Sequence, residues 1–500
     1  MLLSNLAAVR AVCGAVEGTY GPRGLDCLLV DERGGMVLTN DGVTILRYLA
    51  VTHPAARLLV EAAKAQERAV GDGTTTAVIL AGALIGEGVS QILRGVPVTR
   101  VIGGIKMGIG QALSTLRAFR RPVAGLGDPV AADVALVAGR GDAGLARTVL
   151  AAAEIVGAGR LNDETFNLAE SVLGLEGVAD EAFSGLAIER EPVVPEIVRS
   201  LHDVKVLVIE GSLEPEPLPH EALASAAGLA KADAQLNEFH EKLALLVDSG
   251  VGLIVASRGI PDSAAQFLAD RGVLVLRRVP ERDLRRAAVL TGARLLRHAA
   301  GQRSGLAGAL GQARSVEYDA QSRLVRIVNG REAKETTILV GGGTAEAVAE
   351  RERIAKDAAS AVQQAIKGGV VPGGGAAELA LSLSLDRYKA GMMSAYGIAC
   401  VREALRRPLA QLAANAGFNP LEKLEEVWAA QERSGRPGLG IDAETGAVTD
   451  QAENGIWDPF PVKEHALRIA GEVCTAVLRI GSILKMRSED GCEEGWHDPG

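Results

Sequence analysis

Apolar residues recur at helical spacing along most of the first 119 residues. Residues three and four positions apart share one face of an α-helix, so this spacing predicts amphipathic helices that bury one side. Two short apolar runs flank the turn signal Asp-Glu-Arg-Gly-Gly, which predicts a strand pair. We expect helices at 2–17, 55–69, 74–93 and 98–119, and strands at 25–30 and 36–38.

The middle of the chain, about 177–330, has a different pattern. Short apolar runs alternate with longer helical stretches, as in α/β folds. A proline-rich segment at 214–219 fits neither a central strand nor a helix interior. The long helix after it would bury a face made of Leu229, Leu236, Phe239, Leu243 and Leu246. We expect strands at 204–209, 252–256 and 273–276, and helices at 221–247, 262–271 and 281–290.

Helical spacing dominates the last part of the chain. Residues 123–145 have weak periodicity and precede a helix at 145–156. Helical ends around an α/β middle suggest a middle domain inserted into a helical one, a multidomain fold with α and α/β parts. The acidic tail at 486–500 is expected to be disordered. We expect the last helices at 343–367, 376–384, 391–416, 420–432 and 463–485.

Composition restricts the class of protein. A chain of 500 residues is too long for one core, so roughly two to four domains are expected. The net charge of −9, without a basic run, argues against nucleic-acid binding. Five scattered cysteines form neither a disulfide framework nor a zinc site, which favours the cytoplasm. We expect no membrane span, and the first helix, which contains Arg10, does not read as a signal peptide.

The most informative motif is Gly-Asp-Gly-Thr-Thr-Thr at 71–76, directly before an apolar helix. Glycines allow a tight turn and close approach to a ligand, and free N–H groups at a helix start favour an anion. Asp72 adds a hard carboxylate oxygen of the kind that Mg²⁺ prefers. A phosphate with its metal is one interpretation. An ordinary turn with threonine caps is the other.

Three further glycine turns stand at polar positions. The loop 19–24 suits a rigid nucleotide contact, or simply ends a helix. The segment 40–44 presents Asp41 as a metal or water ligand, or forms a hairpin turn. The glycines at 373–375 permit close approach of the backbone to a ligand. No Walker motif or dinucleotide fingerprint is present, so a nucleotide site here needs another design.

Taken together and in this order, the motifs closely resemble the chaperonins, and the archaeal and eukaryotic cytosolic type (group II) more than the bacterial type with a detachable lid. The spacing from Asp357 to the triple glycine resembles the bacterial type, and this mixture suggests the bacterial chaperonins called group III. The resemblance covers nearly the whole chain. The segments that carry it are 5–46, 53–80, 252–293, 370–378, 412–420 and 440–459.

The resemblance implies three domains. Both chain ends would form an equatorial, ATP-binding domain, and a small intermediate domain would be split. The α/β middle would be the apical, client-binding domain, with a helical protrusion at about 210–240 as a built-in lid. The boundaries implied are 1–122 and 372–487 (equatorial), 123–176 and 331–371 (intermediate), 177–330 (apical) and a disordered tail at 488–500.

The resemblance also implies a role for each motif in binding ATP or ADP with Mg²⁺. Asp72 would bind the metal, and Asp458 would accept the ribose hydroxyls. Asp357 would activate the attacking water, assisted by Asp41. A carboxylate that arrives on hinge closure would couple hydrolysis to shape change. The other nucleotide contacts would be Gly21, Pro22, Gly24, Gly42, Gly73, Thr74, Thr75, Thr76, Gly373 and Gly374.

For the client-binding domain, the resemblance places Leu213, Leu218 and Leu223 near the protrusion. They would contact the lid or clients, or would pack at the base of the protrusion. On helix 262–271, one face would be core and the other would meet clients. The core face holds Ala264, Phe267 and Leu268, and the client face holds Gln266 and Arg271.

One departure stands out. The family's nucleotide-sensing lysine loop should fall near 133–145, where this chain has no lysine and offers only Arg140. The leading hypothesis is an ATP-driven chamber of two stacked rings, a homo-oligomer of 16 that folds non-native proteins without a separate co-chaperonin. The alternative is a ring scaffold or holdase without productive ATP cycling. A small-molecule enzyme is a weaker third class, because no substrate pocket with its own catalytic set is evident.

Overall fold

The structure is a computed structural model, and it describes residues 1–30, 34–194, 200–215, 226–297, 308–328, 335–388, 391 and 394–484. The chain divides into two compact units. Met1–Val123 and Gly368–Gly500 form one, here called the terminal unit, and Ala124–Lys367 form the other, the middle unit. Both chain ends therefore build a single unit.

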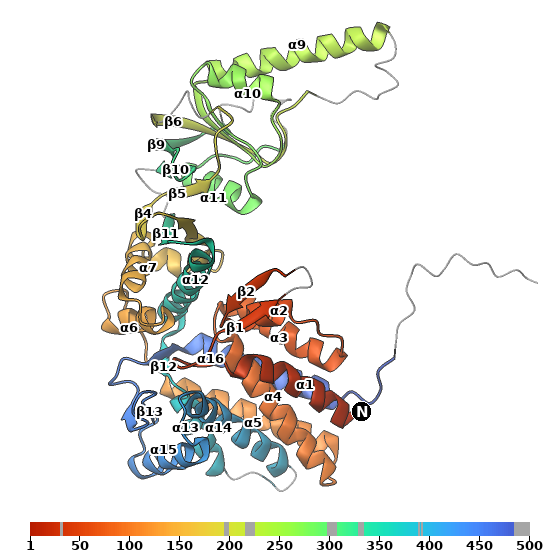
Figure 1. Cartoon of the computed structure of the whole chain (residues 1–500), viewed down its shortest axis with the longest axis vertical. Helices are drawn as coiled ribbons and strands as arrows, with labels where there is room; N and C mark the ends of the chain where they lie inside the picture. Colours follow the sequence, from red (N-terminus) through yellow and green to blue (C-terminus); the bar gives the residue numbers. More distant parts are fainter. Residues whose placement is uncertain are drawn as a thin grey trace, which may run out of the picture. The chain divides into compact units, whose positions relative to one another are not determined.

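The terminal unit is mainly helical (Figure 1). The first four predicted helices are present within one residue of their expected bounds. The helices are α1 (Leu2–Glu17), α2 (Gly42–Tyr48), α3 (Pro54–Val70), α4 (Thr74–Leu93), α5 (Val98–Phe119), α13 (Ala376–Asp386), α14 (Ala395–Asn415), α15 (Pro420–Ser434) and α16 (Phe460–Leu478). Three antiparallel strand pairs join them: β1 (Cys27–Val30) with β2 (Met36–Thr39), β12 (Val370–Pro372) with β15 (Trp457–Pro459), and β13 (Leu439–Ile441) with β14 (Val448–Asp450).

Helix α4 is the centre of the terminal unit, where it packs against α16, α14, α1 and α3. By length and composition it is also the one helix in the described residues that could cross a membrane. The sequence analysis, which expected no membrane span, did not single out this stretch as long and apolar enough for one. However, 56% of its apolar window is buried inside the protein, as in the core helix of a soluble protein.

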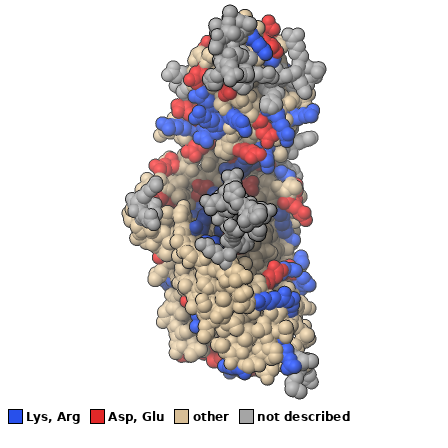
Figure 2. Space-filling view, turned by 90° about the vertical axis from the view of Figure 1, so that its right-hand side faces the viewer, with Lys and Arg blue, Asp and Glu red and all other residues tan. Residues whose placement is uncertain are grey.

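The β1–β2 hairpin has an apolar outer face. Its cross-strand pairs Leu28–Leu38 and Val30–Met36 have exposed fractions of 55–69%. Figure 2 shows few charged side chains over much of the lower part of the molecule, which is the terminal unit. The four exposed apolar side chains on this face of the hairpin are of the kind that usually marks a contact with another chain.

The described residues of the middle unit form two sheets (Figure 1). The larger has the strand order β5-β10-β9-β6-β7-β8, with parallel pairing in β6-β7-β8 and antiparallel pairing elsewhere. The smaller has the order β3-β11-β4. The strands are β3 (Val172–Glu176), β4 (Glu181–Ser184), β5 (Leu186–Glu189), β6 (Ser200–Ile209), β7 (Val251–Ala256), β8 (Leu274–Leu276), β9 (Gly311–Asp319), β10 (Leu324–Val328) and β11 (Thr336–Gly342).

Helices cover both faces of the larger sheet. Helix α11 (Glu281–Thr291) buries Leu284, Ala287 and Leu290 against one face. Helices α9 (Ala226–Asp248) and α10 (Asp262–Ala269) bury the opposite face. The smaller sheet packs with α7 (Ala143–Val156) and α12 (Ala345–Gly368), and α6 (Pro129–Ala138) and the one-turn α8 (Ala158–Leu161) lie beside α7. The α/β prediction for the middle therefore holds.

Several detailed expectations change. Leu213 is buried in the core beneath α9, so the interpretation that it packs at the base is correct. Leu218 and Leu223, and the side chain of Leu229, lie outside the described residues. Leu236 is 46% exposed, so its assignment to the buried face is wrong. Figure 1 shows why: the first half of α9 runs beyond the sheet that its second half covers.

The core face predicted for helix 262–271 is buried on α10, and the residues predicted to meet clients are exposed. Ala264 and Leu268 are fully buried, and Phe267 packs partly buried against the same core. Gln266 and Arg271 are exposed. Arg271 stacks on the Phe267 ring, with its guanidinium carbon 3.6 Å from the ring centroid.

Candidate functional site

The loop Gly71–Thr76 joins two helices through left-handed glycines. Gly71 ends α3 with φ of +67°, and Gly73 precedes α4 with φ of +75°. A Cβ atom at Gly73 would lie 2.5 Å from Cγ1 of Val462. The first turn of α4 has no side-chain cap, so the interpretation of the threonines as ordinary caps is wrong. The N–H groups at this helix start remain available to an anion.

Gln66, which sequence reasoning missed, holds this loop in place. Its buried amide Nε2 donates to the carbonyls of Asp72 (2.9 Å) and Val462 (3.2 Å). Its Oε1 lies 2.6 Å from Nδ1 of His465. The sequence did contain a sign that Gln66 is buried: it is a polar residue at helical spacing from Leu59 and Ala63, which are fully buried.

The Asp41 turn lies against the start of α4. Asp41 is the N-cap of α2 and accepts from the N–H groups of Val43 (3.2 Å) and Thr44 (2.9 Å). The hairpin interpretation of this segment is therefore wrong. A Cβ atom at Gly42 would lie 2.4 Å from Oγ1 of Thr75, so the two motifs are in direct contact.

The loop Gly21–Gly24 reaches the same region. Gly21 has φ of +86°, and a Cβ atom there would overlap Leu412. The Asn415 amide donates to the carbonyls of Glu17 and Tyr20, each at 2.8 Å, and so fixes the start of the loop. The hydroxyl of Thr76 donates to the Tyr20 hydroxyl at 3.4 Å, which joins this loop to α4. Gly24 is close-packed too, since a Cβ atom there would lie 2.2 Å from the Thr19 carbonyl oxygen.

The triple glycine forms a second helix start. Gly374 and Gly375 have φ of +62° and +77°, and Gly375 precedes α13 without a side-chain cap. The strand pair β12–β15 sets Asp458 opposite Val371. A Cβ atom at Gly373 would lie 3.2 Å from Cγ of Asp458, so the carboxylate lies directly beside the glycine turn.

A buried lysine that sequence reasoning missed lies behind Asp458. Nζ of Lys463, in the first turn of α16, lies 2.8 Å from Oδ2 of Asp458 and 2.6 Å from Oε1 of Glu378. Burial alone would lower the pKa of Lys463, but Asp458 and Glu378 raise it well above its usual value. The signal was a cation on the apolar stripe of α16, in line with the buried Leu467 and Ala470.

The site has an excess of negative charge. Burial and the Asp458 carboxylate raise the pKa of Asp72 to about 6. Burial, with Asp41 and Asp72, raises the pKa of Glu67 to about 7. These carboxylates repel one another, and a cation would relieve the repulsion. Within the described ranges no group of three acidic, His or Cys side chains forms a metal cage, so Mg²⁺ here would need phosphate and water oxygens as well.

Asp357 and Arg140 belong to the middle unit. Asp357 is half-buried on α12. Arg140 adopts a left-handed backbone with φ of +55°, and its Nη1 lies 2.8 Å from Oε1 of Glu350, also on α12. The segment expected to hold a nucleotide-sensing loop is instead the end of α6 and a four-residue turn before α7.

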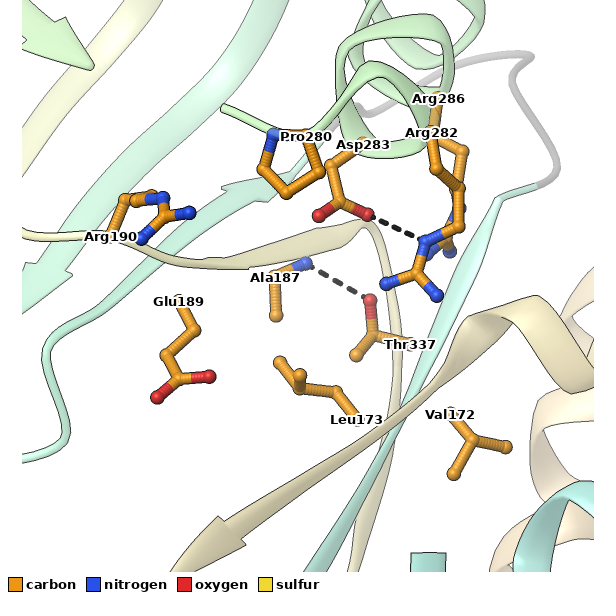
Figure 3. Close-up of a pocket in the computed structure, with 10 residues that line it drawn as sticks. All are labelled: Val172, Leu173, Ala187, Glu189, Arg190, Pro280, Arg282, Asp283, Arg286 and Thr337. Carbon is orange, nitrogen blue, oxygen red and sulfur yellow. Dashed lines mark hydrogen bonds and ion pairs between the residues drawn. The ribbon is translucent and has the colours of Figure 1, made fainter. Parts of the chain in front are cut away.

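A cavity of about 250 Å³ lies in the middle unit between the two sheets and α11 (Figure 3). None of the predicted site residues lines it. Two of its three arginines are engaged in ion pairs: Arg286 pairs with the buried Glu335 at 3.2 Å, and Arg282 pairs with Asp283 at 3.1 Å. The candidate site around Asp72 and Asp458, which lies in the terminal unit, is therefore separate from this cavity.

A helical unit built from both chain ends, with two glycine-led helix starts beside carboxylates, and a separate α/β unit are what the resemblance to the chaperonins predicts. The chain belongs to the TCP-1/cpn60 chaperonin family, whose sequence profile matches residues 12–488. The thermosome subunit of Pyrococcus abyssi is 32% identical over 510 residues, which cover 98% of this chain and 92% of that protein. The thermosome subunit alpha of Thermoplasma acidophilum is also 32% identical, over 96% of this chain and 91% of that one.

Among solved structures, a group III chaperonin in the open state matches with a TM-score of 0.86. It is 40% identical, and the match covers 97% of this chain and 98% of that one. These findings confirm the predicted family and the multidomain α and α/β fold class. They also confirm the predicted activity class, an ATP-dependent chaperonin whose ATP hydrolysis is coupled to protein folding.

Proposed function

We propose that this chain is one subunit of an ATP-driven protein-folding chamber with a built-in lid, and that its terminal unit binds ATP and ADP with Mg²⁺. The observation that carries the proposal is that both glycine turns lie against one short segment, since Gly73 packs on Val462 and Gly373 lies beside Asp458, whose charge acts on Asp72. Two uncapped helix starts favour phosphate, and the repelling carboxylates favour a cation.

Each residue has a distinct part in the proposed site. Asp72 would hold Mg²⁺, which neutralises phosphate charge during hydrolysis. The glycines let these turns pack closely, because a Cβ atom at Gly73 would meet Val462 and one at Gly42 would meet Thr75. Asp458 would accept the ribose hydroxyls, and Asp41 would assist near the metal while capping α2. The phosphate contacts would be Gly73, Thr74, Thr75, Thr76, Gly373 and Gly374, with Gly21, Pro22, Gly24 and Gly42 lining the same site.

We assign the client-binding role to the larger sheet of the middle unit and its helices. In this proposal 177–330 is the apical domain, 123–176 with 331–371 is the intermediate domain, and 1–122 with 372–487 is the equatorial domain. Helix α9 would belong to the lid, supported by Leu236, an apolar side chain that is 46% exposed on it. Asp357 would activate water when the intermediate domain closes.

The chain would assemble with copies of itself into two stacked rings in the cytoplasm. Support comes from the exposed apolar face of the β1–β2 hairpin, which covers no core of its own subunit. Sixteen subunits of 51.9 kDa give about 830 kDa. The likeness to a group III chaperonin supports the assignment of this chain to the group III type. The built-in lid would make a separate co-chaperonin unnecessary. Clients would be non-native proteins.

The test combines three measurements on the purified chain. We expect a ring particle by electron microscopy, ATP hydrolysis that requires Mg²⁺, and ATP-dependent recovery of a chemically unfolded client enzyme. A monomer at every concentration would exclude the chamber. A ring that binds the client but neither hydrolyses ATP nor releases active client would instead support the scaffold or holdase alternative.

A further inference from the structure

The ion-pair network of Asp458, Lys463 and Glu378 extends from the open part of the site into the core. The Asp458 side chain is 26% exposed, whereas those of Lys463 and Glu378 are only 7% and 2% exposed. The three come from three elements: β15, α16 and the first turn of α13. Lys463 thus links a partly open carboxylate to a buried one.

This geometry fixes one oxygen of Asp458. Oδ2 lies 2.8 Å from Nζ of Lys463, and the carboxyl carbon lies beside Gly373, where no side chain intervenes. An Nζ held between two carboxylates cannot move toward one without leaving the other. The second oxygen, Oδ1, has no hydrogen-bond partner within the described part of the chain, and the 26% exposure of the Asp458 side chain allows a ligand to approach it.

A purely structural role is a poor explanation for the buried ion-pair network of Asp458, Lys463 and Glu378. Burying a charged network is often no more stabilising than packing apolar residues of the same volume. Oε2 of Glu378 is buried and finds no partner among the described residues, which adds a further cost. The cost of burying this network is explained if the network serves to orient the partly exposed carboxylate of Asp458.

We propose that Lys463 is a positioning residue for nucleotide recognition: held by Glu378, it orients Asp458 so that the free carboxylate oxygen accepts hydrogen bonds from the ribose hydroxyls. The inference rests on the proposed nucleotide site and deepens it. It assigns ribose selectivity to a three-residue chain in which only Asp458 touches the ligand.

The test compares the affinity for ADP with that for 2′,3′-dideoxy-ADP, which lacks both hydroxyls, by calorimetry on the assembled protein with Mg²⁺. The wild type should prefer ADP by about tenfold or more, as expected for hydrogen bonds to a carboxylate. The Lys463→Met/Glu378→Leu variant should reduce this preference to about twofold or less, while its affinity for 2′,3′-dideoxy-ADP stays unchanged. The double change avoids leaving a buried carboxylate unpaired.

Two controls separate the outcomes. Asp458→Asn should also lose the preference for ADP over 2′,3′-dideoxy-ADP. Glu378→Gln keeps a hydrogen-bonding group beside Lys463 and should lose only part of that preference. It replaces the double variant in the test if the double variant does not fold. The positioning role of Lys463 is overturned if the double variant, or Glu378→Gln in its place, keeps the full preference for ADP. It is also overturned if that variant binds ADP and 2′,3′-dideoxy-ADP more weakly by the same factor. Wild-type protein that binds both ligands equally overturns it while leaving the nucleotide site intact, whereas protein that binds neither overturns the proposed function too.

Discussion

Gly73 and Val462 are packed so closely that a side chain at position 73 would overlap the valine. A Cβ atom built at position 73 would lie 2.5 Å from Cγ1 of Val462. The two residues are far apart in sequence, yet this contact joins the start of α4 to the start of α16. It also makes the loop of Asp72 sensitive to a single methyl group.

Gly73→Ala should therefore disturb the loop. A left-handed backbone costs a residue with a Cβ about 1–2 kcal/mol, and the clash with Val462 adds to this. We expect at least about a tenfold loss of ADP affinity together with a lower midpoint of urea unfolding. Gly86→Ala is the matched control, because it lies within α4, where an added Cβ meets only Leu6 at 3.9 Å. Equal ADP affinities of the two variants would contradict the assigned role of the loop.

Asp72→Asn should make the nucleotide-free protein more stable. An acid whose pKa is raised by folding destabilises the folded state above that pKa, and this cost disappears once both states are protonated. Asparagine removes the repulsion and keeps an oxygen for the Gly73 N–H, which donates to Oδ1 of Asp72 in the wild type.

The free energy of unfolding of Asp72→Asn should exceed that of the wild type by on the order of 1–2 kcal/mol at pH 8. This figure is lower than the pKa shift alone would give, because Asp72 is partly exposed and solvent screens its charge. The difference should shrink as pH falls from about 6 toward 4, through the folded-state pKa of Asp72. Chemical unfolding of both proteins across this range measures the effect, and Mg²⁺ should no longer strengthen nucleotide binding in the variant. A stability difference that does not vary with pH would show that Asp72 is not under this repulsion.

The parts of the site that sequence predicted are those governed by local backbone geometry. Gly73, Gly374 and Gly375 all have positive φ, and each stands at a turn that the sequence already marks. The helices were predicted because their buried stripes repeat along a single segment. Such features need no knowledge of what lies across the fold.

The parts that were missed depend on distant partners. Lys463 and Glu378 are 85 positions apart, and Gln66 lies 399 positions from His465. Nothing in either segment alone indicates that they meet. Strand β9 was missed for another reason: its alternation of buried and exposed residues changes phase at Ser315, which interrupts the period-two pattern that identifies a half-buried strand.

Asp357→Ala should separate binding from turnover. If its carboxylate activates the attacking water, its loss should lower the rate of ATP hydrolysis by about 10²-fold, within the range for a missing general base. ADP affinity should stay within about twofold, because the residue would act on water rather than on the nucleotide. Glu346→Ala, an exposed acid in the first turn of the same helix, is the matched control. Hydrolysis at the wild-type rate would place the water-activating group elsewhere.

Charging the outer face of the β1–β2 hairpin should prevent ring assembly without unfolding the subunit. Leu28 and Leu38 are directly opposite each other and 55% and 59% exposed, so Leu28→Lys with Leu38→Glu replaces an apolar pair by an opposite-charge pair that still supports the hairpin. An apolar contact with a neighbouring copy would then have to bury two charges, which is costly. We expect size-exclusion chromatography to show monomers with a wild-type circular dichroism spectrum. Leu421→Lys, at a 73% exposed position on α15, should leave the ring intact, and rings formed by the hairpin variant would place the subunit contact on another surface.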